Sequence, residues 1–145
     1  MKRALVIYST KGGRTEAIAQ CIAEGLGAAG VVAQLRNAAE VEGGADLEGF
    51  DAYVFGSATY HHEMMKPARQ LLSLAENVDL KGRAGGAFGA FGWSGEATDV
   101  IFETMSHTLG MDMVSEPLRI QSATAEEDSE TARAYGRLVA AKLPS

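Results

Sequence analysis

The fold of this chain is decided by residues 8–16, YSTKGGRTE. A short apolar run at residues 4–8 leads into this stretch, and a segment with helical periodicity follows it. A loop between the carboxyl end of a strand and the amino end of a helix presents free main-chain N–H groups and the positive end of the helix dipole. Both features favour a bound anion. The stretch therefore predicts a strand, an anion-binding loop and a helix, in that order.

The residue types of this loop suit it to a phosphate. Gly12 and Gly13 allow a tight turn and a close approach to a ligand, and Thr10 and Thr15 offer hydroxyl donors. Neither G-x-G-x-x-G nor G-x-x-x-x-G-K-[ST] occurs in the loop. The pattern that remains is [ST]-x-x-G-x-T. Taken alone it is a modest signal, because any strand-to-helix turn favours Gly and Thr.

Length, charge and cysteine content narrow the class of protein. The 145 residues fit one domain, residues 1–145, and the 13 basic and 19 acidic side chains give a net charge of −6. This charge argues against nucleic acid as a partner and favours redox protein partners with basic patches. We expect the chain itself to be a monomer or weak homodimer. Cys21 cannot form an internal disulfide and is expected to be a core thiol. No apolar run reaches the roughly 18 residues of a membrane span, so we expect no membrane insertion and a cytoplasmic protein.

Strand-like and helix-like periods alternate along the chain. Strands are expected at residues 3–8, 31–35, 52–55, 84–88 and 111–120. Helices are expected at residues 15–28, 64–75 and 97–109 and from residue 124, with a short helix and loops over 37–49. Such alternation predicts an α/β fold, a three-layer sandwich around a five-stranded parallel sheet of order 2-1-3-4-5. We expect Pro117 in an irregular or edge part of the fifth strand, and a capping box from Thr124 to Glu127.

Three loops of small residues follow the first, third and fourth expected strands. In the predicted sheet these loops lie side by side at the carboxyl ends of the strands, where ligands of such sheets bind. The first loop is a phosphate cradle, the second contains Tyr60, and the third contains Trp93. A polar cradle beside two aromatic side chains predicts a site for a planar, phosphorylated ring system.

The second and third loops carry a resemblance to a known family. The segment GSATYHHEMMKPARQLL (residues 56–72), followed by GAFGAFGWSGEA (residues 86–97), resembles the flavodoxin-like domain of the A-type flavoproteins, or flavodiiron proteins. Nearly the whole chain shares in this resemblance, which implies a flavodoxin fold with FMN as cofactor. The residues that it implies for FMN contact are Thr10, Lys11, Gly12, Gly13, Arg14 and Thr15 at the phosphate, with Ser57, Ala58, Thr59, Tyr60 and His61 on one side of the flavin and Phe91, Gly92, Trp93, Ser94 and Gly95 on the other.

Some positions depart from the family pattern. Lys11 and Arg14 place positive charges in a loop that is mostly uncharged in flavodoxins, and they either support the phosphate or face solvent. His61 and His62 stand where many flavodoxins have Gly beside an acidic residue, and a protonated imidazole there is expected to stabilise an anionic reduced flavin. The di-iron ligand cluster H-x-[ED]-x-D-H of the A-type flavoproteins does not occur in this chain, and we assign no metal ligands.

The resemblance implies an FMN-binding flavodoxin that shuttles electrons between redox proteins, and we assign no catalytic residues. One alternative is an NAD(P)H-dependent FMN or quinone reductase. Another is the detached flavin module of a flavodiiron-type oxygen or nitric oxide reductase system. A receiver domain of the same strand order is disfavoured, because Ser9, Thr10 and Ser57 stand where its acidic residues belong.

Overall fold

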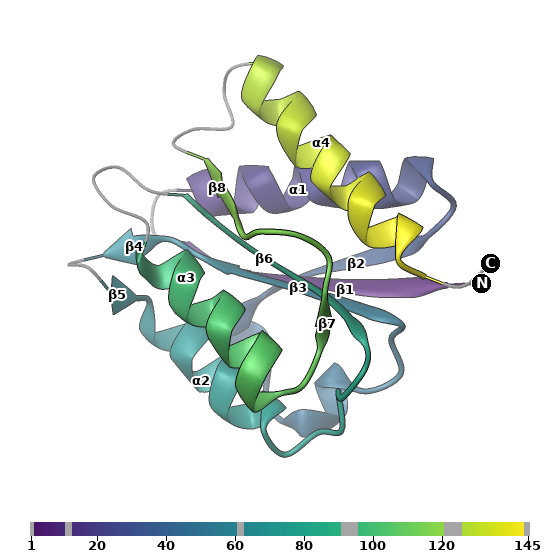
Figure 1. Ribbon diagram of the computed structural model, residues 1–145. Helices are drawn as coiled ribbons and strands as arrows, with labels where there is room; N and C mark the ends of the chain where they lie inside the picture. Colours follow the sequence, from purple (N-terminus) through teal and green to yellow (C-terminus); the bar gives the residue numbers. More distant parts are fainter. Residues whose placement is uncertain (1, 11–12, 61–62, 91–95, 121–125, 144–145) are drawn as a thin grey trace.

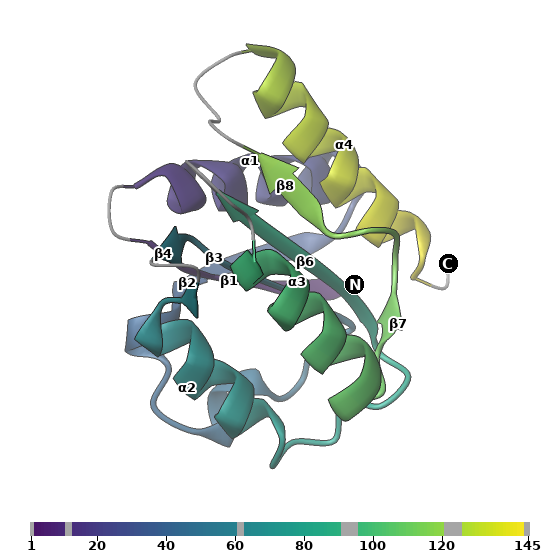
Figure 2. The same ribbon diagram turned by 60° about the vertical axis from the view of Figure 1, so that its left-hand side comes forward.

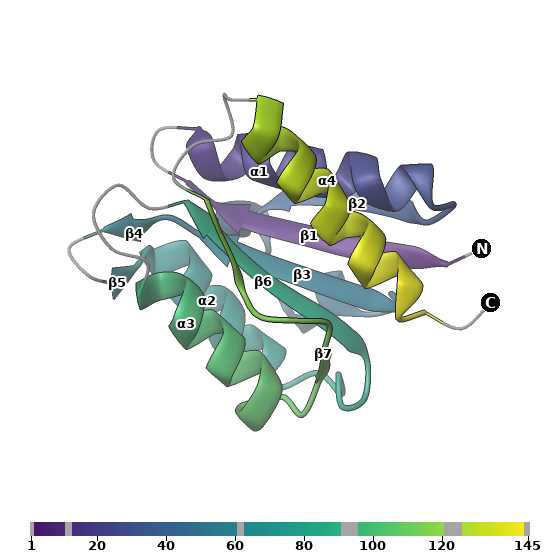
Figure 3. The same ribbon diagram turned by 45° about the horizontal axis from the view of Figure 1, so that its top comes forward.

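A parallel sheet lies between two layers of helices (Figure 1). The computed structural model describes residues 2–10, 13–60, 63–90, 96–120 and 126–143. Helices α1 (Arg14–Ala28) and α4 (Glu126–Ala141) cover one face of the sheet. Helices α2 (Lys66–Ala75) and α3 (Glu96–Glu103) cover the other, as the rotated view in Figure 3 shows. The expected three-layer α/β sandwich is confirmed.

The order of the strands in the main sheet also follows the prediction. Its strands among the described residues are β1 (Arg3–Ser9), β2 (Val32–Asn37), β3 (Ala52–Ser57), β6 (Ala84–Ala90), β7 (Asp112–Met113) and β8 (Leu118–Ile120). Their order is β2-β1-β3-β6-β7, with β8 also paired to β6, and every pair is parallel. The strands β3 and β6 are buried along their whole length, as expected for central parallel strands.

The fifth strand differs from the prediction, because it is not continuous over residues 111–120. β7 pairs with Ala84 and Gly85, β8 pairs with residues 88–90, and the chain between them bends at Ser115 and Glu116. Pro117, which has no N–H group to donate to a sheet, ends this bend. The expected irregularity around Pro117 therefore divides the strand into two short pieces.

The segment after β3 forms a small hairpin that periodicity did not predict. Residues of β4 (Thr59–Tyr60) pair antiparallel with those of β5 (Glu63–Met64). The hairpin uses residues that were expected to open the next helix, so α2 begins at Lys66 rather than Met64, with Pro67 in its first turn. The expected short helical structure over residues 37–49 is present as two 3₁₀ helices, η1 (Ala38–Glu40) and η2 (Gly44–Leu47).

The helix predicted for residues 97–109 changes its hydrogen-bonding pattern partway along. The α-helical part ends at Glu103, and the π-helical segment η3 (Thr104–Thr108) follows. The N–H group of Leu109 donates to the carbonyl of Thr104 at 2.9 Å, five residues back, and Gly110 leaves the helix with φ of 67°. The start of the expected capping box, Thr124, lies outside the described residues.

The helices α1 and α4 approach each other closely because each has a glycine against the main chain of the other helix. A Cβ atom on Gly25 would lie 2.0 Å from the carbonyl oxygen of Arg133, and one on Gly136 would lie 2.2 Å from that of Ile22. Neither position admits a side chain without separating the helices. Cys21 packs at the border of this layer and is half-buried rather than fully buried as the sequence predicted. No helix within the described residues is both long and apolar enough to cross a membrane.

Candidate functional site at the carboxyl ends of the strands

The ends of β1, β3 and β6 lie next to one another in the sheet, and the three predicted loops begin there (Figure 2). Ser9 at the end of β1 is in register with Ser57 at the end of β3. The N–H group of Ala58 continues this pairing by donating to the carbonyl of Ser9 at 3.1 Å. Of the predicted site residues, Lys11, Gly12, His61 and residues 91–95 lie outside the described part of the chain.

The first loop enters α1 through a glycine in the left-handed conformation. Gly13 is the residue before the helix and has φ of 87°, a region that favours glycine. Its N–H group donates to the hydroxyl oxygen of Thr10 at 2.9 Å, and its carbonyl accepts from the N–H group of Ala17 at 3.1 Å. Thr10 thus closes the loop on itself. Arg14, the first residue of α1, is exposed.

Thr15 in the first turn of α1 holds the most informative polar atom of the site. Its side chain is fully buried, and its hydroxyl oxygen has no hydrogen-bond partner among the described residues. Burying a hydroxyl without a partner costs about 1–3 kcal/mol. The first N–H groups of a helix also lack partners within the helix. An oxygen-rich anion at this helix end would satisfy both kinds of donor, so these residues fit the phosphate of FMN.

The second loop uses its hydroxyl groups to hold the protein itself. The Ser57 hydroxyl donates to the carbonyl of Ala58 at 2.8 Å and accepts from the N–H group of Met65 at 3.1 Å. This hydroxyl therefore links the residue at the end of β3 to the residue that follows β5. The hydroxyl oxygen of Thr59 accepts from the N–H group of Ala97 at 3.2 Å. Both side chains were predicted to lie along the cofactor, and the structure shows in addition that they fix the loop.

Glycines allow the second and third loops to start from closely packed strands. A Cβ atom on Gly89 would lie 2.0 Å from the hydroxyl oxygen of Thr98 and 2.7 Å from the carbonyl oxygen of Ser57. A Cβ atom on Gly56 would lie 2.4 Å from the ring of Phe88. The ends of β3 and β6 and the first turn of α3 therefore form one tightly packed base.

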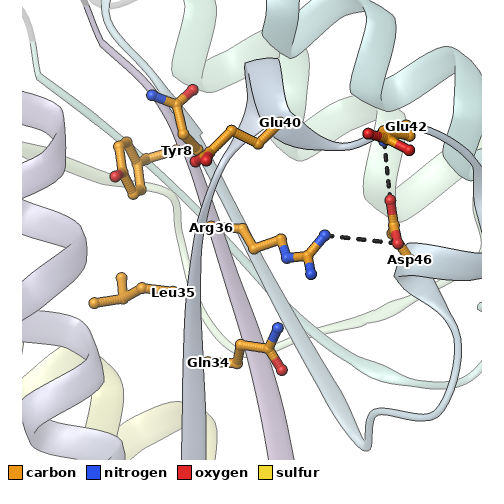
Figure 4. A pocket seen from close by; sticks show the side chains of 8 residues that line it. Tyr8, Gln34, Leu35, Arg36, Glu40, Glu42 and Asp46 are labelled. Atoms are coloured by element: carbon orange, nitrogen blue, oxygen red, sulfur yellow. Dashed lines mark hydrogen bonds and ion pairs between the residues drawn. The ribbon is translucent and has the colours of Figure 1, made fainter.

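Sequence reasoning missed a polar cavity of about 600 Å³ beside the first loop, at the end of the edge strand β2 (Figure 4). Arg36 points toward Asp46 and pairs with it at 3.6 Å, and the N–H group of Glu42 donates to the same carboxylate at 2.9 Å. The sequence feature that could have indicated this cavity is the group of acidic residues Glu40, Glu42 and Asp46, which lies within the segment expected to form a short helix and loops. The residues that line the cavity are Tyr8, Gln34, Leu35, Arg36, Asn37, Glu40, Glu42 and Asp46.

Tyr8 joins this cavity to the first loop, since it precedes Thr10 by two residues. Partial burial raises the pKa of the Tyr8 phenol, and the negative charge of Glu16, which accepts a hydrogen bond from the phenol, raises it further. Glu40 adds a smaller effect in the same direction. The carboxylates of Glu16 and Glu40 therefore make the surroundings of the Tyr8 phenol acidic.

Comparison with known proteins agrees with the fold. The family model for flavodoxin matches residues 6–136. The flavodoxin of Nitratidesulfovibrio vulgaris is 26% identical, with 97% of this chain and 99% of that protein covered. The type A flavoprotein fprA of Rhodobacter capsulatus is 30% identical over 98% of this chain. The solved structure of an archaeal flavodoxin superposes with a TM-score of 0.89 at 30% identity and covers 97% of each chain.

A parallel sheet of this strand order with helices on both faces defines the flavodoxin-like class of α/β proteins. The chain belongs to the flavodoxin family, and FMN is its cofactor. The chain spans about a third of the length of the first larger relatives that it matches, 33% of the Rhodobacter protein and 36% of the rubredoxin-oxygen oxidoreductase of Megalodesulfovibrio gigas.

Proposed function

We propose that this chain is a cytoplasmic electron shuttle that carries electrons on FMN between separate redox proteins. The observation that carries the proposal is the buried hydroxyl of Thr15 in the first turn of α1, which has no partner among the described residues. A helix end with a buried hydroxyl donor and free main-chain N–H groups favours a dianionic phosphate. When bound, FMN takes up and releases one or two electrons, and the protein contributes binding, orientation and electrostatics.

In this proposal the first loop binds the phosphate of FMN, and the second and third loops contact its flavin ring. Thr10, Lys11, Gly12, Gly13, Arg14 and Thr15 hold the phosphate. The segments 57–61 and 91–95 flank the flavin ring, with Tyr60 and Trp93 as the ring contacts. The closed turn from Thr10 to Gly13 supports the first assignment. The packed base under the second and third loops supports the other two, because it sets both loops on rigid strands.

In this proposal the negative charge of the chain favours redox partners with positively charged docking surfaces. The net charge of −6 and the acidic side chains Glu40, Glu42 and Asp46 near the end of β2 favour donors and acceptors with basic docking patches. Association of this kind depends on ionic strength, so electron transfer to a basic partner is expected to slow as salt is added. The chain acts in this scheme as a monomer or weak homodimer.

The decisive experiment is to purify the full chain, record its visible spectrum and titrate the FMN-free protein with FMN and with riboflavin, which lacks the phosphate. Thr15→Val removes the hydroxyl and keeps the shape of the side chain. Loss of a hydrogen bond to a charged group, about 1.5–3 kcal/mol, is expected to weaken FMN binding about 10- to 100-fold. Riboflavin affinity should not change. Thr131→Val, on the exposed face of α4, is the matched control.

Two results would contradict the proposal. A colourless protein that binds neither flavin removes the function as a whole. A Thr15→Val variant that loses affinity for FMN and riboflavin alike removes the phosphate assignment, because the lost contact would then involve the part that the two ligands share.

The second candidate function is the detached flavin module of a flavodiiron-type system. The 30% identity to the Rhodobacter type A flavoprotein, over a third of that protein's length, favours it. Reduced protein would then transfer electrons to a separate di-iron protein much faster than to unrelated acceptors. The further alternative is a reductase, and steady-state oxidation of NADH or NADPH with a quinone acceptor tests it. The shuttle proposal predicts a negligible rate of this oxidation.

A further inference from the structure

Thr59 connects two segments that are far apart in the sequence. It lies in β4, within the second loop, and its hydroxyl oxygen accepts from the N–H group of Ala97 at 3.2 Å. Ala97 is the second residue of α3, so this N–H group is one of those at a helix start that have no partner within the helix. The hydroxyl of Thr59 therefore caps α3 from a position 38 residues earlier in the chain.

The hydrogen bond between Thr59 and Ala97 lies at the start of α3, directly after the third loop. The third loop, residues 91–95, joins Ala90 at the end of β6 to Glu96 at the start of α3. At its first end, β6 is in register with β8, where Ala90 is opposite Ile120. At its second end, the hydrogen bond from Ala97 to Thr59 ties the helix start to the second loop. The start of α3 is thus joined to β4 through one side chain.

The described residues on both sides of the second loop are bound to the rest of the fold. The Ser57 hydroxyl binds the N–H group of Met65, and Thr59 is opposite Met64 in the β4–β5 pair. Below it, the missing side chain of Gly89 allows Thr98 of α3 and the carbonyl of Ser57 to pack against β6. The start of α3 is consequently fixed by two contacts, the packing of Thr98 against Gly89 of β6 and the hydrogen bond from Ala97 to Thr59.

We infer that Thr59 is a positioning residue for the flavin, because by capping α3 it fixes the start of that helix beside β4. This inference rests on the proposed placement of FMN between the second and third loops. Removing the cap releases the start of α3, which follows residues 91–95 directly in the chain, while the contacts of Gly13 and of the first turn of α1 remain intact. The expected loss of affinity therefore concerns the ring and not the phosphate.

The test compares Thr59→Val, which keeps the shape and removes the acceptor, with Thr59→Ser, which keeps the acceptor. Loss of one ordinary hydrogen bond predicts about three- to tenfold weaker binding for Thr59→Val. FMN and riboflavin affinity should fall by the same factor, in contrast to the effect of Thr15→Val. Thr59→Ser should bind both flavins within about twofold of the wild type, and Thr131→Val should behave as wild type.

Amide hydrogen exchange at Ala97, measured by NMR in the full chain with and without FMN, provides a readout apart from affinity. Exchange should quicken in Thr59→Val and stay slow in Thr59→Ser. Faster exchange at Ala97 with unchanged affinity for both flavins would overturn the inference and leave FMN binding standing. A loss confined to FMN would also overturn it, since Thr59 would then act on the phosphate. A wild-type chain that binds no flavin removes the proposed function and this inference together. Should Thr59→Val fail to fold, Thr59→Ala is judged by the same measurements against Thr59→Ser.

Discussion

The hydroxyl of Tyr135 binds both main-chain groups of Ala87. It accepts from the N–H group at 3.0 Å and donates to the carbonyl at 3.2 Å, and both residues are buried. The carbonyls of Arg83 and Gly85 are bound by N–H groups of Asp112 and Val114 in the fifth strand. Ala87 is the next residue of β6 to face that side, opposite the gap between β7 and β8. A side chain of α4 thus replaces the missing part of a strand.

Tyr135→Phe should destabilise the protein by about 1–3 kcal/mol, because two buried main-chain groups lose their partner. Leu138→Ala on the same helix, where the side chain is 51% exposed, is the control and should change stability by less than about 0.5 kcal/mol. Urea unfolding of the FMN-free protein gives both values. Equal midpoints for wild type and Tyr135→Phe would show that water or a main-chain shift can take over from the hydroxyl.

The same tyrosine predicts a loss of stability at alkaline pH. Burial raises the pKa of Tyr135 to about 12, above its ordinary value of 10.0. The folded protein therefore keeps a proton that the unfolded chain gives up, so the stabilising effect is full below pH 10 and is lost as the pH rises toward 12. The slope should approach about 1.4 kcal/mol per pH unit. Urea unfolding between pH 9 and 11 (roughly the start of Tyr ionisation) should show a shallower slope for Tyr135→Phe than for wild type, and parallel slopes would argue against this cause.

The role of Tyr135 shows where prediction from sequence ends. The helical spacing of Tyr135 predicts a packing residue, but no periodic pattern reveals that a hydroxyl will meet the main chain of a strand 48 residues earlier. The order of the strands was predictable, because apolar runs, glycine-containing loops and the handedness of crossovers leave few arrangements. Thr15 was likewise predictable as a site residue, from its place after the two glycines.

Short elements were the ones that the sequence did not reveal. The β4–β5 hairpin joins two residues to two, which is too short for a period of two to stand out. It also occupies Met64, which fits the apolar face of the following helix equally well in the sequence. Cys21 shares the spacing of buried residues on α1, yet it is only half-buried against a core cluster that includes residues of α4, and the sequence of α1 alone does not show how far that distant helix covers it.

Two glycines of α1 should respond in opposite ways to alanine. Gly25→Ala places a Cβ atom against the carbonyl of Arg133, and such overpacking costs about 1–3 kcal/mol or more. Gly27→Ala meets no atom within 4 Å and should stabilise the helix by about 0.5–1 kcal/mol. Urea unfolding of both variants measures the difference. A tolerated Gly25→Ala would mean that α1 and α4 can separate without loss of their core.

Arg14→Ala tests the charge at the phosphate loop. The side chain is exposed at the start of α1, so the expected loss of FMN affinity is modest, about three- to tenfold, and smaller at high salt. The flavin potentials should barely change, because the charge lies at the phosphate and away from the ring. Arg137→Ala on α4 is the control for net charge. Unchanged FMN affinity in Arg14→Ala would assign this side chain to the solvent-facing surface.

The divided fifth strand also limits how the sheet can add another chain. Exposed strand edges with free N–H and carbonyl groups serve as templates for intermolecular pairing and aggregation. On one edge of the described sheet, β7 and β8 offer 2 and 3 residues, and Tyr135 covers the groups of Ala87 between them. The opposite edge, β2, offers 6 residues and exposes Val32 and Leu35. Intermolecular strand addition to the described sheet, should it occur at high concentration, is therefore expected to start at β2.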